Sequence, residues 1–131
     1  MDIRIAFAIP TIVALTALSA CATRPAATQA ADTGLDRMER LTLNAHRCWF
    51  KSKDPAFARY TLAPELSSFS GRPRFLLVPK GKPEERPLVV IEGRSGSSEI
   101  ETYGPLMSDT IGHRIGADIK RWSAGDNGCA S

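Results

Sequence analysis

The chain has 131 residues, a length that fits one domain and excludes large catalytic scaffolds such as barrels or a full dinucleotide-binding domain. Hydrophobic residues make up 43% of it and charged residues 24%, which is typical of a folded globular protein and excludes wholesale disorder. The formal net charge is +3, and beyond the N-terminus no apolar stretch is long enough to cross a bilayer.

Residues 1–20 have the pattern of a secretory signal peptide. A weakly basic start with Arg4 leads into an apolar run, Ile5 to Leu18, which is shorter than the roughly 20 residues that a membrane-spanning helix needs. The run closes with Leu18-Ser19-Ala20-Cys21, which resembles the lipobox of bacterial lipoproteins. The resemblance implies that Cys21 is lipidated and begins the mature chain, and that Ala22 directs it to the outer membrane, facing the periplasm. The alternative is an ordinary signal peptide followed by a chance cysteine.

Residues 21–32 are then expected to form the lipidated cysteine and a flexible tether, because residues 22–32 are small and polar and lack an apolar period. Each buried CH₂ of an acyl chain adds about 0.8 kcal/mol, so several chains on one cysteine would hold the protein lastingly at the membrane. Residues 33–131 are expected to form a single globular periplasmic domain.

The domain is expected to open with a helix that starts at the cap Thr33, with Asp36 three residues on, and ends near Phe50. The opposite face, which includes Asn44, is expected to meet solvent. Apolar positions recur at helical spacing at Leu35, Met38, Leu41, Ala45, Cys48 and Trp49.

After this helix, Asp54-Pro55 predicts a single helical turn over Ala56–Tyr60, and residues 63–73 have the composition of a loop. Strands are predicted at Arg74–Pro79, Leu88–Glu92 and Glu99–Tyr103. Because the connections over 80–87 and 93–98 are short and polar, neighbouring strands are expected to be antiparallel. The Gly- and Ser-rich connection over 93–98 is interpreted as a hairpin loop rather than a phosphate-binding loop, since it joins two strands.

A second helix is predicted over Asp109–Ser123, with Ser108 as its cap and Gly125 as its stop. The order helix, three strands, helix predicts an α+β domain with three or four antiparallel strands and both helices on one face of the sheet. A small β-barrel-like domain is the alternative if residues 57–63 are also extended.

Cys48 and Cys129 remain as an even pair in a compartment where disulfides persist. A bridge between them would close nearly the whole domain and contribute about 4.5 kcal/mol in the chain-entropy model. The alternatives are a metal site or a reactive thiol pair, but the sequence has no C-x-x-C spacing.

Two features are candidates for a partner surface. Gly112 and Gly116 lie four apart on the second helix, where each costs about 1 kcal/mol relative to alanine, so close packing on the sheet or first helix, or a docking groove, is expected there. A basic run around the first predicted strand suggests either a solvated rim or a surface for envelope anions. Its members are Arg72, Arg74, Lys80, Lys82 and Arg86.

The remaining polar residues suggest no catalytic or metal constellation. His46 and His113 lie on the two predicted helices without a nucleophile motif beside them. The carboxylates of Glu92, Glu99 and Glu101 are interpreted as solvated, because an edge hairpin rarely offers the pocket that an acid pair needs.

These observations predict a non-catalytic cell-envelope lipoprotein, a tethered binding or accessory module for an envelope protein or polymer, with no nucleic-acid partner and no cofactor. In a general way it resembles the small outer-membrane lipoproteins that serve as accessory subunits of envelope machines. One alternative is a lipoprotein inhibitor of lysozyme-like enzymes, although Ser95-Gly96 lies too far from Tyr103 to match their Ser-Gly-x-x-Tyr-like motif. A cell-wall-acting enzyme is the other.

Overall fold

The computed structural model describes residues 33–67 and 69–130. The predicted signal peptide, the predicted lipidation site Cys21 and the predicted tether lie outside these residues. Within the described part of the chain, no helix combines the length and the apolar character that crossing a membrane requires.

The first helix, α1, spans Gly34–Ala45 and continues as a π-helical segment over His46–Lys51. Its start was predicted correctly: the Thr33 hydroxyl accepts a hydrogen bond from the Asp36 N–H, and the Asp36 carboxylate accepts one from the Thr33 N–H. The second helix, α2, spans Thr110–Ser123.

Between the helices, four antiparallel strands form one sheet in the order β1-β2-β3-β4. The strands are β1 (Tyr60–Glu65), β2 (Arg74–Pro79), β3 (Val89–Gly93) and β4 (Ile100–Tyr103). The predicted α+β fold with an antiparallel sheet is confirmed, and the connection between β3 and β4 joins two antiparallel strands as expected.

Two local predictions were wrong. Residues 60–65, expected as the end of a turn and a loop, form the edge strand β1, where Pro64 is tolerated because an edge strand has an unpaired side. Ser108 does not cap α2; it ends a 3₁₀ turn, Pro105–Ser108, and Asp109 takes the cap position.

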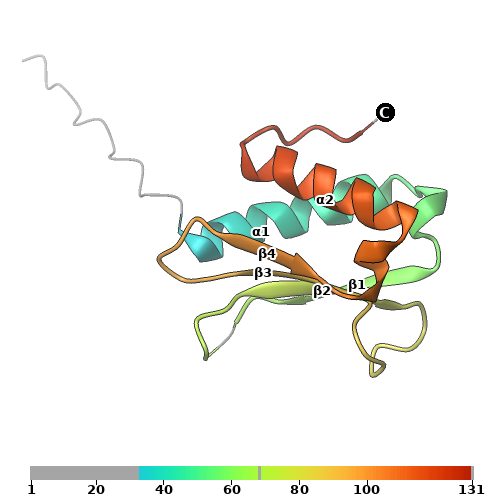
Figure 1. The fold of residues 1–131 in the computed structure, drawn as a ribbon, viewed down its shortest axis with the longest axis horizontal. Helices are drawn as coiled ribbons and strands as arrows, with labels where there is room; N and C mark the ends of the chain where they lie inside the picture. The colour runs from blue at the N-terminus through green and yellow to red at the C-terminus, as the bar shows by residue number, and fades with distance from the viewer. Residues whose placement is uncertain (1–32, 68, 131) are drawn as a thin grey trace, which may run out of the picture.

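Both helices lie over the same face of the sheet (Figure 1). The core between these layers is contributed by Met38, Leu41, Trp49, Phe57, Phe75, Leu77, Val89, Ile91, Ile115, Ile119 and Trp122. On the opposite face of the sheet, Leu76, Val78 and Val90 form a smaller buried cluster with Ala63 packed against it.

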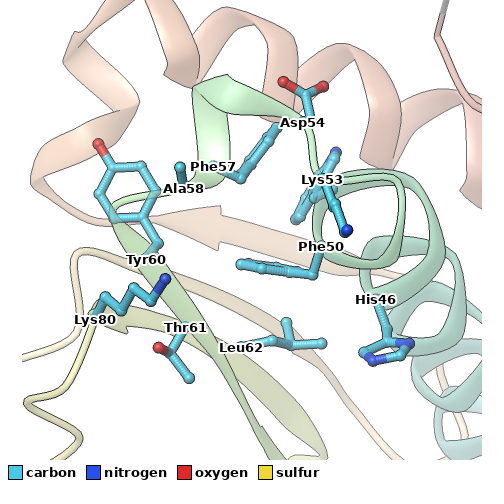
Figure 2. Close-up of a pocket in the computed structure, with 11 residues that line it drawn as sticks. His46, Phe50, Lys53, Asp54, Phe57, Ala58, Tyr60, Thr61, Leu62 and Lys80 are labelled. Atoms are coloured by element: carbon cyan, nitrogen blue, oxygen red, sulfur yellow. The ribbon is translucent and has the colours of Figure 1, made fainter.

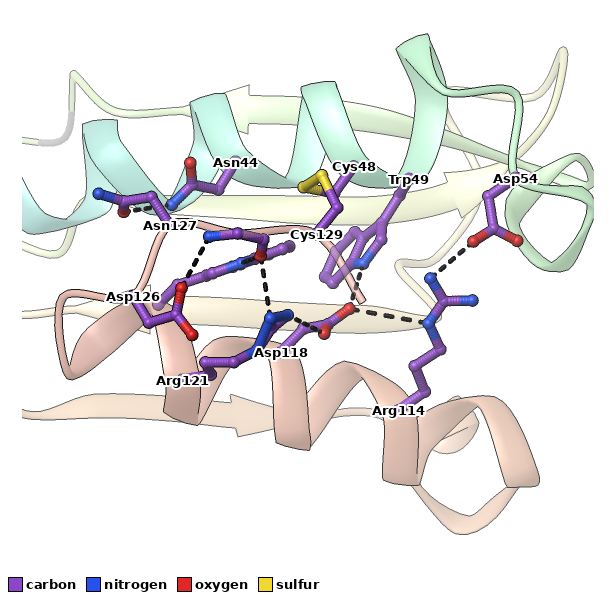
Figure 3. Close-up of polar contacts among 12 residues, drawn as sticks. Asn44, Cys48, Trp49, Asp54, Arg114, Asp118, Arg121, Asp126, Asn127 and Cys129 are labelled. Atoms are coloured by element: carbon purple, nitrogen blue, oxygen red, sulfur yellow. Dashed lines mark hydrogen bonds and ion pairs between the residues drawn. A yellow bond between two sulfur atoms is a disulfide. The ribbon is translucent and has the colours of Figure 1, made fainter. Parts of the chain in front are cut away.

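The predicted disulfide is confirmed: Cys48 and Cys129 are bonded, with their Cα atoms 5.2 Å apart and a separation of 81 positions in sequence. The bridge holds the C-terminal segment against the first helix, and polar contacts fix it there (Figure 3). Nδ2 of Asn44 donates to Oδ1 of Asn127 over 2.7 Å, and Arg47 donates to the Asn127 carbonyl. Trp122 Nε1 donates to the Gly128 carbonyl over 2.8 Å.

Candidate functional site

A pocket of about 450 Å³ opens where the end of the first helix meets the beginning of β1 and the end of β2 (Figure 2). This volume lies in the range of small-molecule sites. The residues that line this aromatic pocket are His46, Trp49, Phe50, Lys53, Asp54, Phe57, Ala58, Tyr60, Thr61, Leu62 and Lys80.

The floor of the aromatic pocket is a rigid stack of rings. Trp49 and Phe57 are fully buried, and their rings stack with centroids 4.6 Å apart and planes inclined by 8°. Phe50 meets Phe57 edge-on at 6.0 Å, and the guanidinium carbon of Arg114 lies 5.4 Å from the centroid of the Phe57 ring. Trp49 also donates a hydrogen bond of 2.8 Å to Asp118. The positions of the rings that form the floor are therefore fixed by contacts in the core.

A short turn brings Phe57 into this stack. The Asp54 carboxylate accepts a hydrogen bond of 2.9 Å from the Ala56 N–H, and Pro55 follows as the first residue of the 3₁₀ turn Pro55–Phe57. The sequence signal at Asp54-Pro55 therefore predicted the start of this turn correctly. Its extent is shorter than expected, because the chain becomes extended at Tyr60.

The rim of the pocket carries charge of predominantly one sign. Lys53 and Lys80 are exposed cations there, and the His46 side chain is exposed beside them. Asp54 is the one carboxylate among the lining residues, and Arg114 engages it at 2.6 Å. Partial burial alone would raise the pKa of Asp54, but the Ala56 N–H and the Arg114 guanidinium together hold that pKa below its usual value. Asp54 is therefore an ionised, paired group, and the rim is net cationic.

Lys53, at the rim of the pocket, has an unusual backbone conformation. Its φ angle is 59°, in the left-handed region that glycine and asparagine adopt more readily than lysine. Figure 2 shows Lys53 beside Phe50 on one side of the pocket and Lys80 beside Tyr60 and Thr61 on the other. Two cations thus flank one aromatic floor.

Sequence reasoning missed this pocket, although a signal for it was present. Four of the nine aromatic residues of the chain fall within residues 49–60. What the sequence did not indicate is the pairing of Tyr60 with Pro79, which brings Lys80 to the same rim.

The predicted basic run does not form one surface. Arg72 precedes β2 and Arg74 begins it, whereas Lys82 and Arg86 follow its end. Lys80 belongs to the aromatic pocket. Arg72 Nε lies 2.8 Å from Glu92 Oε1, and Lys82 Nζ lies 3.0 Å from Glu85 Oε1. Most of this charge is therefore already paired within the chain.

Arg74 and Glu92 belong to a ladder of ion pairs that crosses the strands. Arg74 Nε lies 2.6 Å from Glu65 Oε2 on β1, and Glu92 on β3 receives Arg72 and, at 3.9 Å, Arg74. The hydrogen bond to Glu65 raises the pKa of Arg74, against the opposing effect of burial. The expectation that Glu92 is solvated was wrong, since it is only 6% exposed, whereas Glu99 and Glu101 are exposed.

The glycines of α2 pack on a neighbour that the sequence did not indicate. A Cβ atom on Gly112 would lie 2.5 Å from the Leu106 carbonyl oxygen and from Met107 Cα, so this position approaches the backbone of the 3₁₀ turn Pro105–Ser108. A Cβ atom on Gly116 would lie 3.8 Å from Met107 Cε, an ordinary contact. The face expected to pack on the sheet or the first helix, or to receive a partner, is thus covered by the turn before α2.

Among residues 33–67 and 69–130, no group of three or more His, Cys, Asp or Glu side chains is arranged to hold a metal ion. Comparison of the chain with models of protein families, with curated proteins and with solved structures finds no match.

Proposed function

We propose that this chain is a lipid-anchored, non-catalytic binding protein of the cell envelope, held at the outer membrane through Cys21 and facing the periplasm. The lipobox-like sequence before Cys21 and the Cys48–Cys129 disulfide, a bond typical of oxidising compartments, support the address. The observation that carries the binding function is the aromatic pocket, a preformed concave site with an apolar floor and a charged rim.

The position of the pocket suits a tethered protein. The described chain begins at Thr33, at one end of α1, whereas the pocket is lined by His46, Trp49 and Phe50 just beyond the other end. The 12-residue helix α1, at about 1.5 Å per residue, separates them by roughly 18 Å. The pocket therefore lies beyond the end of α1 that is farther from the predicted tether.

The one carboxylate among the described lining residues is poorly suited to act as a general base. A general base works best with a pKa near the ambient pH, but the pKa of Asp54 is held below its usual value by Ala56 and Arg114. Its carboxylate oxygens are already committed to those two partners.

Expression of the full chain in a Gram-negative host tests this proposal. We expect palmitate incorporation and recovery with outer membranes, and we expect the Cys21→Ser variant to lose both.

A Thr61→Cys probe at the pocket should react with a membrane-impermeant maleimide only after the outer membrane is permeabilised. Wild-type protein without palmitate contradicts the anchor, and release of cell-wall fragments by the purified protein contradicts the non-catalytic role. Inhibition of lysozyme would instead favour the inhibitor alternative.

A further inference from the structure

We infer that the aromatic pocket takes a small organic anion, a carboxylate attached to an apolar group. The inference deepens the proposed binding function and rests on it. It depends on three features of the lining residues, namely an apolar floor, a cationic rim and a single acid that is already paired.

The apolar part of the ligand would lie on side chains that are incompletely buried. Phe50, Tyr60 and Leu62 pack against the core but remain partly open to solvent. Trp49 and Phe57 behind them are fully buried and stacked, so the floor needs no rearrangement before binding. Covering such partly exposed apolar surface is favourable by roughly 25 cal/mol per Å².

The charged part of the ligand would lie between Lys53 and Lys80. Their ammonium groups flank the opening, and the charge of Asp54 is offset by Arg114 at 2.6 Å. Lys51 and Arg59, which lie close in sequence to the lining residues Lys53 and Tyr60, are also exposed cations. Among residues 33–67 and 69–130, neither Lys53 nor Lys80 has an ion-pair partner, so an anion entering this pocket would not have to displace one.

A cationic ligand is the competing possibility, because aromatic rings attract cations through their faces. Here Arg114 already lies 5.4 Å from the centroid of the Phe57 ring, and the lysines at the rim repel a second positive charge.

Photoaffinity labelling of the purified full-length protein tests the inference with three matched probes. An aryl diazirine carries a carboxylate, a primary alcohol or a trimethylammonium group, and the labelled residues are mapped by mass spectrometry. We expect the carboxylate to label the segment 50–62 with a half-saturating concentration about tenfold below that of the alcohol. Equal labelling by the alcohol, or stronger labelling by the ammonium probe, would overturn the inference.

Charge-matched variants separate the rim lysines from overall charge. Lys53→Asn, which keeps a residue suited to a left-handed backbone, is combined with Lys80→Ser. We expect this pair to raise the half-saturating concentration of the carboxylate about tenfold and to leave that of the alcohol unchanged. The control pair Lys82→Ser and Lys120→Ser removes the same charge from exposed positions outside the pocket and should change neither. No effect of the rim pair overturns the inference.

Competition identifies the source of the anion. Decanoate represents lipid-derived acids, and acetyl-leucyl-phenylalanine represents the C-terminus of a peptide. Displacement of the carboxylate probe by either one upholds the inference and names its source, whereas displacement by neither overturns it. Because labelling is mapped to residues, the result stands whether or not the chain carries palmitate, so a failure of the anchor and a failure of the ligand class are distinguishable.

Discussion

Trp49 donates a hydrogen bond of 2.8 Å from its indole Nε1 to Oδ2 of Asp118, and this bond joins the end of the first helix to the middle of α2 inside the core (Figure 3). Asp118 is only 2% exposed. Its other oxygen, Oδ1, receives Arg121 at 2.6 Å. A buried carboxylate is stable in such a place because each of its oxygens has a donor.

Replacing Asp118 should therefore be costly. We expect Asp118→Ala to lower the free energy of unfolding by about 3–5 kcal/mol, because the Trp49 N–H loses its acceptor and the nearby arginine loses its counter-charge. Urea denaturation followed by circular dichroism measures this loss. The control Glu39→Ala removes an exposed acid from α1 and should change stability by less than about 0.5 kcal/mol. Similar losses in both variants would contradict the structural role of Asp118.

The Cys48–Cys129 bridge should stabilise the domain by constraining the unfolded chain. We expect the double variant Cys48→Ala/Cys129→Ala to lose about 2–5 kcal/mol of unfolding free energy. Cys21→Ser, outside the described domain, is the matched control and should leave the unfolding free energy unchanged. Mass spectrometry without reductant should detect the bridge in the wild type, and finding two free thiols would refute it.

Asp54 should make stability depend on pH in a defined direction. Its folded pKa lies below the reference value of 3.8, so its ionised form stabilises the native state above that pH. This stabilisation should be lost as the pH falls through the depressed folded pKa. The difference in unfolding free energy between the wild type and Asp54→Asn should thus be largest near neutral pH and vanish in strong acid.

A double-mutant cycle tests the cause of this pH dependence. Arg114 is the side-chain partner that lowers the pKa of Asp54, alongside the Ala56 N–H. In an Arg114→Gln background, Asp54→Asn should therefore have a smaller effect on the pH profile. An unchanged profile would assign the shift to the backbone donor alone.

The two glycines of α2 should respond in opposite directions to alanine. At Gly112 the added Cβ would meet backbone atoms at 2.5 Å, so Gly112→Ala should destabilise the domain by about 1–3 kcal/mol despite its better helix propensity. At Gly116 the nearest atom is the flexible end of Met107 at 3.8 Å, so Gly116→Ala should stabilise by up to about 1 kcal/mol. Thermal unfolding of the two variants side by side decides this, and equal shifts would contradict the packing of Gly112 on the turn.

Local signals predicted much of the fold. The capping pair Thr33 and Asp36, the branched runs of β2 and β3, and the apolar stripe of α2 each depend on neighbours in sequence, and each was placed to within a few residues. The edge strand β1 was missed because Ala63-Pro64 has the composition of a loop, and only its pairing with β2 makes it a strand.

The wrong predictions of solvent exposure for individual side chains also result from contacts between residues distant in sequence. Asn44 falls on the predicted polar face of the first helix, yet it is 3% exposed because the C-terminal segment, 83 residues away, covers it. Glu92 is buried because arginines from β2 and the segment before it fold over it. The periodicity of a sequence indicates which side chains share a face of a helix or strand. Whether that face is exposed to solvent depends on contacts with residues far away in the sequence.

The disulfide also determines whether cleavage by a protease would release part of the domain. The exposed connection between β2 and β3, residues 80–87, lies inside the loop that Cys48 and Cys129 close. A single backbone cut there would divide the polypeptide into two fragments that remain covalently joined. Shedding of the C-terminal fragment would require reduction as well as cleavage, so one nick would leave both halves of the domain attached to the same N-terminus.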